Sequence, residues 1–207
     1  MRILYLHGFA SGPSSKKAQF LRRNFEEIGI RLEVLDLAEG NFEHLTISGQ
    51  LAVIKREARG EPVSLIGSSM GGYLAALYAA RHPEVDRVVL MAPAFCFLAR
   101  WPEDLGQEEM RRWQTTGWRN VFHYGDQREM RLSYGIIEDG LRYEDFPVFS
   151  QQGLIFHGTG DDVVPVAFSQ QYASRKPNVR LELLDSGHEL LNVLDRIWKE
   201  TRALFSN

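Results

Sequence analysis

The chain has 207 residues and a single cysteine, Cys96, so no disulfide can form within it. It also contains no Asn-x-Ser/Thr sequon, which is the acceptor motif for N-glycosylation. Disulfides and N-glycosylation sites are typical of proteins that fold in an oxidising compartment, and the sequence provides for neither of them. We therefore expect the protein to be cytoplasmic.

Long apolar runs are absent as well. The apolar run within residues 1–6 is too short for a signal peptide, and no stretch approaches the roughly 20 residues that a membrane-spanning helix requires. The formal net charge is only -3, and acidic and basic residues are mixed along the chain. These properties favour neither nucleic acid nor an anionic membrane as a partner. They predict a soluble protein without a membrane span and give no oligomeric state.

No segment rich in proline, glycine or serine divides the chain, so we expect one domain over residues 1–207. Short apolar runs alternate with amphipathic helical patterns, which is typical of an α/β protein with a parallel sheet and helices on both faces. The runs predict about six strands, at residues 3–6, 32–35, 63–66, 88–91, 154–156 and 181–184. A last helix is expected near residues 190–205, whereas periodicity does not decide between a strand pair and a helix for residues 133–143.

One segment, residues 93–150, interrupts this alternation. It carries many charges and three of the four tryptophans, Trp101, Trp113 and Trp118. An insertion of this kind is expected to form a lid over the site, with aromatic side chains that line an apolar pocket. We predict Phe95 as a substrate-binding residue, because it follows directly after the end of the fourth strand. In the alternative, the tryptophans only anchor the insertion to the sheet.

The most informative motif is Gly67-Ser68-Ser69-Met70-Gly71-Gly72, which lies between an apolar strand pattern and a helical pattern. A Gly-x-Ser-x-Gly turn at such a junction exposes its serine at the helix N-terminus in a strained conformation. The small residues around the serine let the strand and the helix approach closely. We predict Ser69 as a nucleophile, with the backbone N–H of Met70 directed at the developing oxyanion.

A second motif, His157-Gly158-Thr159-Gly160-Asp161-Asp162, follows the predicted strand at residues 154–156. A carboxylate just past a strand end can accept a hydrogen bond from an imidazole, fix its tautomer and stabilise the imidazolium. We predict Asp161 as this acid, with Asp162 as the alternative. Both aspartates have a structural explanation too, since aspartate commonly caps the start of a helix.

Position selects the base among six histidines. His188 lies in a glycine-containing loop between the last predicted strand and the last predicted helix, where a base can reach Ser69. His7 and His157 each stand in a His-Gly pair at a strand end, and we expect them to be packed and hydrogen-bonded. The remaining histidines lie among polar residues and are expected at the surface: His44, His82 and His123. We predict His188 as the base.

The loop after the first strand, residues 7–12, is predicted to complete the site. Gly8 lets the chain turn close to the substrate and is predicted to border it. The backbone N–H of Phe9 is expected to join that of Met70 in an oxyanion hole, where each donor contributes about 3 kcal/mol. The Phe9 ring is expected to line the acyl pocket, unless it packs only on the helix that follows.

Taken together, these motifs resemble the α/β-hydrolase superfamily over nearly the whole chain. Residues 6–18 and the turn at residues 66–73 are similar to small bacterial YqiA-like esterases. Residues 157–165 look more like the mitochondrial acyl-protein thioesterase and acyl-glucuronide esterase group. The resemblance implies an α/β-hydrolase fold and assigns the nucleophile, acid and base to Ser69, Asp161 and His188. The count of about six strands predicts a minimal, mostly parallel sheet that lacks the two antiparallel strands with which larger members of the superfamily begin.

The predicted function is that of a serine carboxylesterase, which transfers the acyl group of a small-molecule ester to water through an acyl-enzyme. No metal or organic cofactor is expected, because no Cys/His cluster has the spacing of zinc ligands. An acyl-thioesterase is an alternative, and four arginines of the insertion are compatible with coenzyme A or an acylated protein: Arg111, Arg112, Arg119 and Arg128. The same fold also suits carbon–carbon bond hydrolysis by the same residues, as well as a non-catalytic protein that binds a small molecule.

Overall fold

The computed structural model describes residues 1–206 and contains a six-stranded sheet in which all neighbouring strands are parallel. The strand order is β2-β1-β3-β4-β7-β8. Each predicted run forms one of these strands: β1 (Ile3–Leu6), β2 (Leu32–Val34), β3 (Val63–Ser68), β4 (Val85–Met91), β7 (Gln152–Gly158) and β8 (Val179–Leu184). The central strands are buried on both faces, which explains why their sequences are continuous apolar runs.

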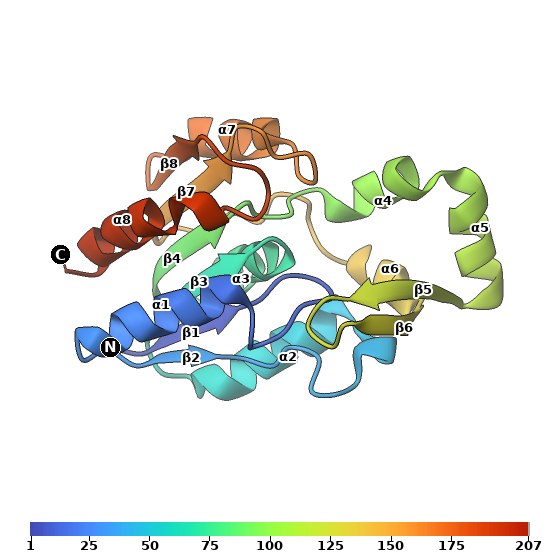
Figure 1. Ribbon diagram of the computed structural model, residues 1–207, viewed down its shortest axis with the longest axis horizontal. Helices are drawn as coiled ribbons and strands as arrows, with labels where there is room; N and C mark the ends of the chain where they lie inside the picture. The colour runs from blue at the N-terminus through green and yellow to red at the C-terminus, as the bar shows by residue number, and fades with distance from the viewer. Residues whose placement is uncertain (207) are drawn as a thin grey trace.

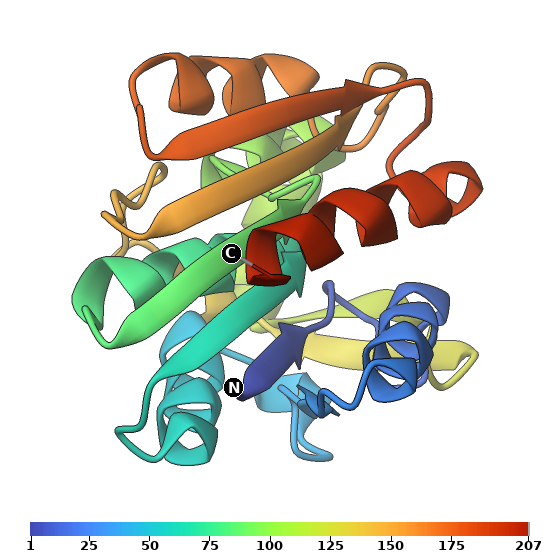
Figure 2. The same ribbon diagram turned by 90° about the vertical axis from the view of Figure 1, so that its left-hand side faces the viewer.

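Helices cover both faces of the sheet. Figure 2 shows α1 (Lys16–Glu27) and α8 (Leu194–Ser206) on one face, and α2 (Ile47–Ala58), α3 (Met70–Arg81) and α7 (Val166–Ser174) on the other. The buried apolar side chains form two hydrophobic clusters, one on each face of the sheet. The last helix begins later than predicted, because Leu190 adopts a φ of 56° and a short 3-10 helix, Leu191–Val193, precedes it.

The insertion between β4 and β7 contains helices and a small sheet of its own. Its elements are α4 (Phe97–Leu105), α5 (Gln107–Thr116), the antiparallel strands β5 (Trp118–His123) and β6 (Arg128–Ser133), and α6 (Gly135–Gly140). They lie together at the right of Figure 1. The hairpin turn reaches the loop after β1, where the N–H of Tyr124 donates to the carbonyl of Ala10 at 2.7 Å. The undecided residues 133–143 therefore comprise the end of β6 and a short helix.

The three tryptophans of the insertion have different surroundings. Trp113 is fully buried and donates from its ring N–H to a carbonyl of β6 at 3.0 Å. Trp118 is half-buried and packs edge-on against the ring of His44. Trp101 instead contacts the ring of Phe9 with the ring centroids 5.7 Å apart. Trp113 therefore packs within the insertion and Trp118 packs against the segment after β2, whereas Trp101 faces the loop that follows β1.

The surface prediction for His123 is wrong. The hairpin folds this side chain inward against the ring of Phe42, with the centroids 4.7 Å apart, and leaves it only 6% exposed. Its Nδ1 atom accepts a hydrogen bond from the N–H of Asp126 at 3.1 Å. The polar residues beside His123 in the sequence do not reveal its contact with Phe42. This contact depends on the hairpin turn, which the periodicity of the sequence did not predict. His44 is exposed as predicted, and His82 is half-buried.

Candidate active site

Ser69 stands where β3 ends and α3 begins, and its backbone has a φ of 53° and a ψ of -117°. A positive φ is rare for a residue with a Cβ atom, and such strain costs about 1–3 kcal/mol. The N–H of Ser69 donates to the carbonyl of Met91 at 2.9 Å, and its own carbonyl accepts from the N–H of Ala94 at 3.0 Å. These bonds to β4 and the residues after it stabilise the strained turn.

Two glycines allow this turn to close. A Cβ atom at Gly67 would lie 2.2 Å from the carbonyl oxygen of Gly71, and one at Gly71 would lie 2.1 Å from the carbonyl oxygen of Leu6. Both distances are far shorter than a van der Waals contact, so only glycine fits at either position. The close approach places Ser69 beside the loop that follows β1.

His188 reaches Ser69 from the loop between β8 and α8. Its Nε2 atom lies 3.1 Å from the Ser69 hydroxyl oxygen, and its Nδ1 atom lies 2.9 Å from Oδ2 of Asp161. An ionised carboxylate only accepts hydrogen bonds, so Nδ1 carries a proton and Nε2 can accept the proton of the serine hydroxyl. The structure thus brings together the three residues that separate motifs pointed to.

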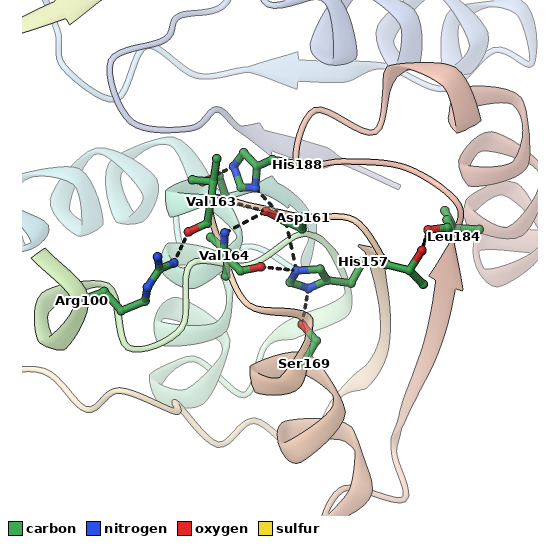
Figure 3. A network of polar contacts seen from close by, with 10 residues as sticks. Arg100, His157, Asp161, Val163, Val164, Ser169, Leu184 and His188 are labelled. Atoms are coloured by element: carbon green, nitrogen blue, oxygen red, sulfur yellow. Dashed lines mark hydrogen bonds and ion pairs between the residues drawn. The ribbon is translucent and has the colours of Figure 1, made fainter. Parts of the chain in front are cut away.

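Hydrogen-bond donors surround the carboxylate of Asp161. Oδ1 accepts the N–H groups of Val163 at 2.9 Å and Val164 at 2.8 Å, and Oδ2 lies 3.1 Å from Nε2 of His157 as well as near His188 (Figure 3). Burial acts to raise the pKa of Asp161, but the hydrogen bonds from His157, His188 and Val164 outweigh it and lower the pKa well below its ordinary value. Asp161 is therefore ionised at neutral pH.

The alternative acid, Asp162, and the two histidines at strand ends, His7 and His157, have different surroundings. Asp162 is exposed to solvent. His7 is buried, and its Nε2 atom accepts a backbone N–H at 3.3 Å. His157 is fully buried, and its Nδ1 atom lies 2.7 Å from the hydroxyl oxygen of Ser169. Both histidines are packed and hydrogen-bonded as predicted, and His188 is the histidine beside the serine.

The two residues whose amides are predicted to form an oxyanion hole lie at the same cavity. Phe9 and Met70 both line the cavity at Ser69. Neither N–H group donates a hydrogen bond to another residue within the range 1–206, so both are available to a ligand oxygen. Gly8 passes directly beside the serine, since a Cβ atom there would lie 3.4 Å from that of Ser69. Gly8 borders the nucleophile and does not line the cavity itself.

The cavity next to Ser69 has a volume of about 130 Å³ and mainly apolar walls, with four aromatic side chains among its eleven lining residues. Phe95 lines it, is fully buried, and stacks on Tyr172 with the ring centroids 4.7 Å apart. Sequence reasoning did not single out the contributions of α4, which are Phe97, Arg100, Trp101 and Asp104. Phe97 and Trp101 are four residues apart, so a helix prediction over this segment would have placed both on one face.

A buried lysine near the histidine loop was also missed. Lys17 lies in the first turn of α1, is 8% exposed, and forms no ion pair within 4.0 Å with any residue that the structure describes. Burial lowers the pKa of its ammonium group, and the negative charges of Glu189 and Asp161 oppose this effect. Lys17 thus places a buried amine on the side of the site that α1 covers, within electrostatic reach of Glu189 and Asp161.

The four arginines considered for coenzyme A or an acylated protein have other surroundings. Arg111, Arg112 and Arg128 are exposed, and the guanidinium of Arg119 lies over the ring of Trp113 at 5.3 Å. None of the four lines the cavity at the serine. Within residues 1–206, no three His, Cys, Asp or Glu side chains are grouped so that they could hold a metal ion. In the same range, every helix is too short or too polar to cross a membrane.

Residues 2–204 match the model of a family described as "Uncharacterised protein family (UPF0227)". The chain belongs to this family. This UPF0227 chain is also 26% identical to the palmitoyl-protein thioesterase ABHD10, mitochondrial, of Bos taurus, over an alignment of 211 residues. The alignment covers 93% of this chain and 68% of the relative.

Two solved structures show the same fold. The alpha/beta hydrolase domain-containing protein 10 from mouse has a TM-score of 0.83 at 20% identity, with 99% of the UPF0227 chain and 89% of the mouse chain covered. Est1E from Butyrivibrio proteoclasticus, with ferulic acid bound, has a TM-score of 0.79 at 18% identity, with 99% and 87% covered. The UPF0227 chain therefore has the α/β-hydrolase fold, which confirms the predicted fold class. The matches are hydrolases, in agreement with the predicted class of enzyme.

Proposed function

We propose that the protein is a serine carboxylesterase that cleaves a carboxylic ester through an acyl-enzyme intermediate. The observation that carries this proposal is the hydrogen-bonded chain from Ser69 through His188 to the ionised Asp161. This hydrogen-bonded chain lies beside a mainly apolar cavity that Phe9 and Met70 line, and the N–H groups of these two residues donate to no other residue that the structure describes. A nucleophile, a base and an acid that orients the base are the groups that acyl transfer requires.

In the proposed reaction, Nε2 of His188 takes the hydroxyl proton of Ser69 as its oxygen attacks the ester carbonyl carbon. The N–H groups of Phe9 and Met70 stabilise the oxyanion of the tetrahedral intermediate. Asp161 stabilises the imidazolium of His188, which then donates its proton to the leaving alcohol. Water next attacks the acyl-enzyme with His188 as the base, which releases the carboxylic acid and restores the serine.

Thioester hydrolysis is a second candidate, and the name of the bovine relative, a palmitoyl-protein thioesterase, favours it. The same three side chains and two amides serve both reactions, since only the leaving group changes from an alcohol to a thiol. A non-catalytic binding protein is less well supported. Such a protein gains nothing from a strained serine aligned with a base, whereas catalysis depends on that alignment.

The proposal predicts stoichiometric labelling of Ser69 by a fluorophosphonate and turnover of p-nitrophenyl butyrate. Labelling requires a serine that a neighbouring base activates, so the heat-denatured protein is the control and is expected to stay unlabelled. The rate of hydrolysis of butyryl-coenzyme A is compared with that of p-nitrophenyl butyrate, which carries the same acyl group. The comparison shows which of the two candidate reactions the protein catalyses faster. A native protein that neither reacts with the fluorophosphonate nor cleaves either substrate would support the binding-protein alternative.

A further inference from the structure

We infer that the cavity at Ser69 accepts only a compact acyl group, no larger than about a benzoyl or hexanoyl group, and that Trp101 sets this limit. The inference rests on the proposed function, because the cavity is an acyl site only if the serine is acylated. It goes further than that function by naming the class of acyl group and the residue that selects it.

The size of the cavity gives the first argument. Its volume is about 130 Å³. An apolar cavity of about 150 Å³ is known to hold one benzene molecule, whereas sites for larger organic ligands start at about 300 Å³. A palmitoyl chain has more than twice as many carbon atoms as benzene. Most of such a chain would have to lie outside this cavity.

The position of Trp101 gives the second argument. Its ring spans from α4 to the loop after β1, with centroid distances of 5.6 Å to Phe97 and 5.7 Å to Phe9. Behind it lies Trp113, fully buried, at 5.1 Å. The Trp101 indole therefore separates the cavity from the apolar interior of the insertion. Its removal would extend the cavity in that direction.

Polar contacts keep this wall in place. Arg100, which precedes the tryptophan, donates a hydrogen bond to the carbonyl of Val163 and forms an ion pair with Asp104 at 3.0 Å (Figure 3 shows the contact with Val163). Val163 also donates to the Asp161 carboxylate, so α4 is tied to the loop of the proposed acid. Arg100 and Asp104 both line the cavity, and a long apolar chain that passed them would displace water from charged groups.

The test is kcat/KM for p-nitrophenyl acetate, butyrate, hexanoate, benzoate, decanoate and palmitate. We expect the highest values for butyrate, hexanoate and benzoate, and a decrease of about tenfold or more for decanoate. Trp101→Ala is expected to raise the decanoate-to-butyrate ratio about tenfold, because the enlarged cavity accepts more of the chain. Trp118→Ala, in the same insertion but outside the cavity, is the matched control and is expected to leave the ratio unchanged.

The outcomes separate this inference from the function on which it rests. A wild-type protein that cleaves no ester overturns both. An active wild type that prefers palmitate, or a folded Trp101→Ala variant with the wild-type chain-length profile, overturns the inference and leaves the esterase proposal standing. Trp101→Leu, which removes less packing against Trp113, provides the same comparison if the alanine variant does not fold.

A separate observation concerns His157, which the proposed reaction does not use. Its Nε2 atom lies 2.9 Å from the carbonyl oxygen of Val164 and 3.1 Å from Oδ2 of Asp161. Both neighbours are acceptors, so Nε2 carries a proton. Nδ1 lies 2.7 Å from the hydroxyl of Ser169, which can donate to it. A neutral ring with its proton on Nε2 therefore satisfies every contact in this fully buried site.

We propose that His157 is a positioning residue that fixes the Asp161 carboxylate against His188. Oδ2 of Asp161 is shared by the two imidazoles, and the N–H groups of Val163 and Val164 bind Oδ1, so the carboxylate cannot rotate without losing a bond. Sharing Oδ2 also reduces the negative charge that the His188 ring experiences. The groups that face this carboxylate are the two histidines and, at longer range, the Lys17 ammonium.

The test compares His157→Leu, which has no donor, with His157→Gln, which keeps an N–H group at a similar reach. The leucine variant is expected to lose about tenfold or more in kcat with little change in KM, because the orientation of the base loosens. The rise of its kcat/KM with pH is expected to move to higher pH, since an unshared carboxylate retains the proton on His188 more strongly. The glutamine variant is expected to recover much of both effects.

A purely structural role for His157 predicts something different. The leucine variant would then unfold at a lower temperature, while its folded fraction kept the wild-type kcat and pH profile, and this result would overturn the proposal. If the leucine variant does not fold, Ser169→Ala provides the comparison, because it removes only the partner of Nδ1. It is expected to change kcat and the pH profile in the same direction by a smaller amount, and an unchanged pair of values counts against the proposal.

Discussion

Ser69→Ala is expected to abolish ester hydrolysis, with a loss in kcat of about 10⁶-fold, and to leave the fold intact. The variant keeps the Cβ atom, so the backbone strain at a φ of 53° is the same in both proteins. The only side-chain hydrogen bond lost is the one to His188. A small residual rate is expected, because the amides of Phe9 and Met70 still bind the oxyanion.

The matched control for this variant is the preceding serine. Ser68 belongs to the same motif and is buried at the end of β3, and its side chain takes no part in the proposed chemistry. Ser68→Ala is expected to retain fluorophosphonate labelling and most of the turnover, whereas Ser69→Ala is expected to lose both. The measurements are the labelled mass by mass spectrometry, the initial rate with p-nitrophenyl butyrate, and the thermal midpoint. Full activity in Ser69→Ala would exclude the proposed nucleophile.

The sheet could be predicted from the sequence because its central strands are buried on both faces. Burial of that kind requires continuous apolar runs, and helices at each connection make the runs stand out. The hairpin of the insertion could not be predicted in the same way. β5 and β6 carry charges on exposed positions and bury only some side chains, such as His123 and Leu132, so their sequences show no clear period.

In the candidate site, too, some residues could be predicted from the local sequence and others could not. Ser69, Asp161 and His188 stand in motifs whose glycines and neighbours follow from local backbone geometry, so each could be found from a few residues. The walls of the cavity could not, because they depend on the path of the insertion in three dimensions. Trp101 looks the same in sequence as Trp118, yet only the former lines the cavity. The contact of His157 with the carboxylate likewise depends on how the loop after β7 folds back.

Asp161→Asn is expected to lower kcat by about 10⁴-fold. Both carboxylate oxygens face two donors each: the N–H groups of Val163 and Val164 at Oδ1, and the rings of His157 and His188 at Oδ2. An asparagine must place its NH₂ group at one of these positions, whichever way the amide is turned. It then either opposes the backbone turn or forces His188 into the tautomer that cannot take the serine proton.

Because the Asp161 carboxylate has four hydrogen-bond donors around it, Asp161→Asn is also expected to lower the thermal midpoint of unfolding. An acid with fewer donors around it would not show this loss of stability. Asp162→Asn is the matched control, because this neighbour is exposed, and it is expected to leave both kcat and the thermal midpoint nearly unchanged. If Asp162→Asn is instead the inactive variant, the acid is assigned to the wrong residue.

The lowered pKa of Asp161 makes the stability of the fold depend on pH. Its ionised form stabilises the fold above the ordinary aspartate pKa of about 3.9, and this contribution is lost as the pH falls toward the folded-state pKa. The difference in thermal midpoint between wild type and Asp161→Asn is therefore expected to be largest near neutral pH and to shrink in acid. A difference independent of pH would show that the charge of the carboxylate does not stabilise the fold.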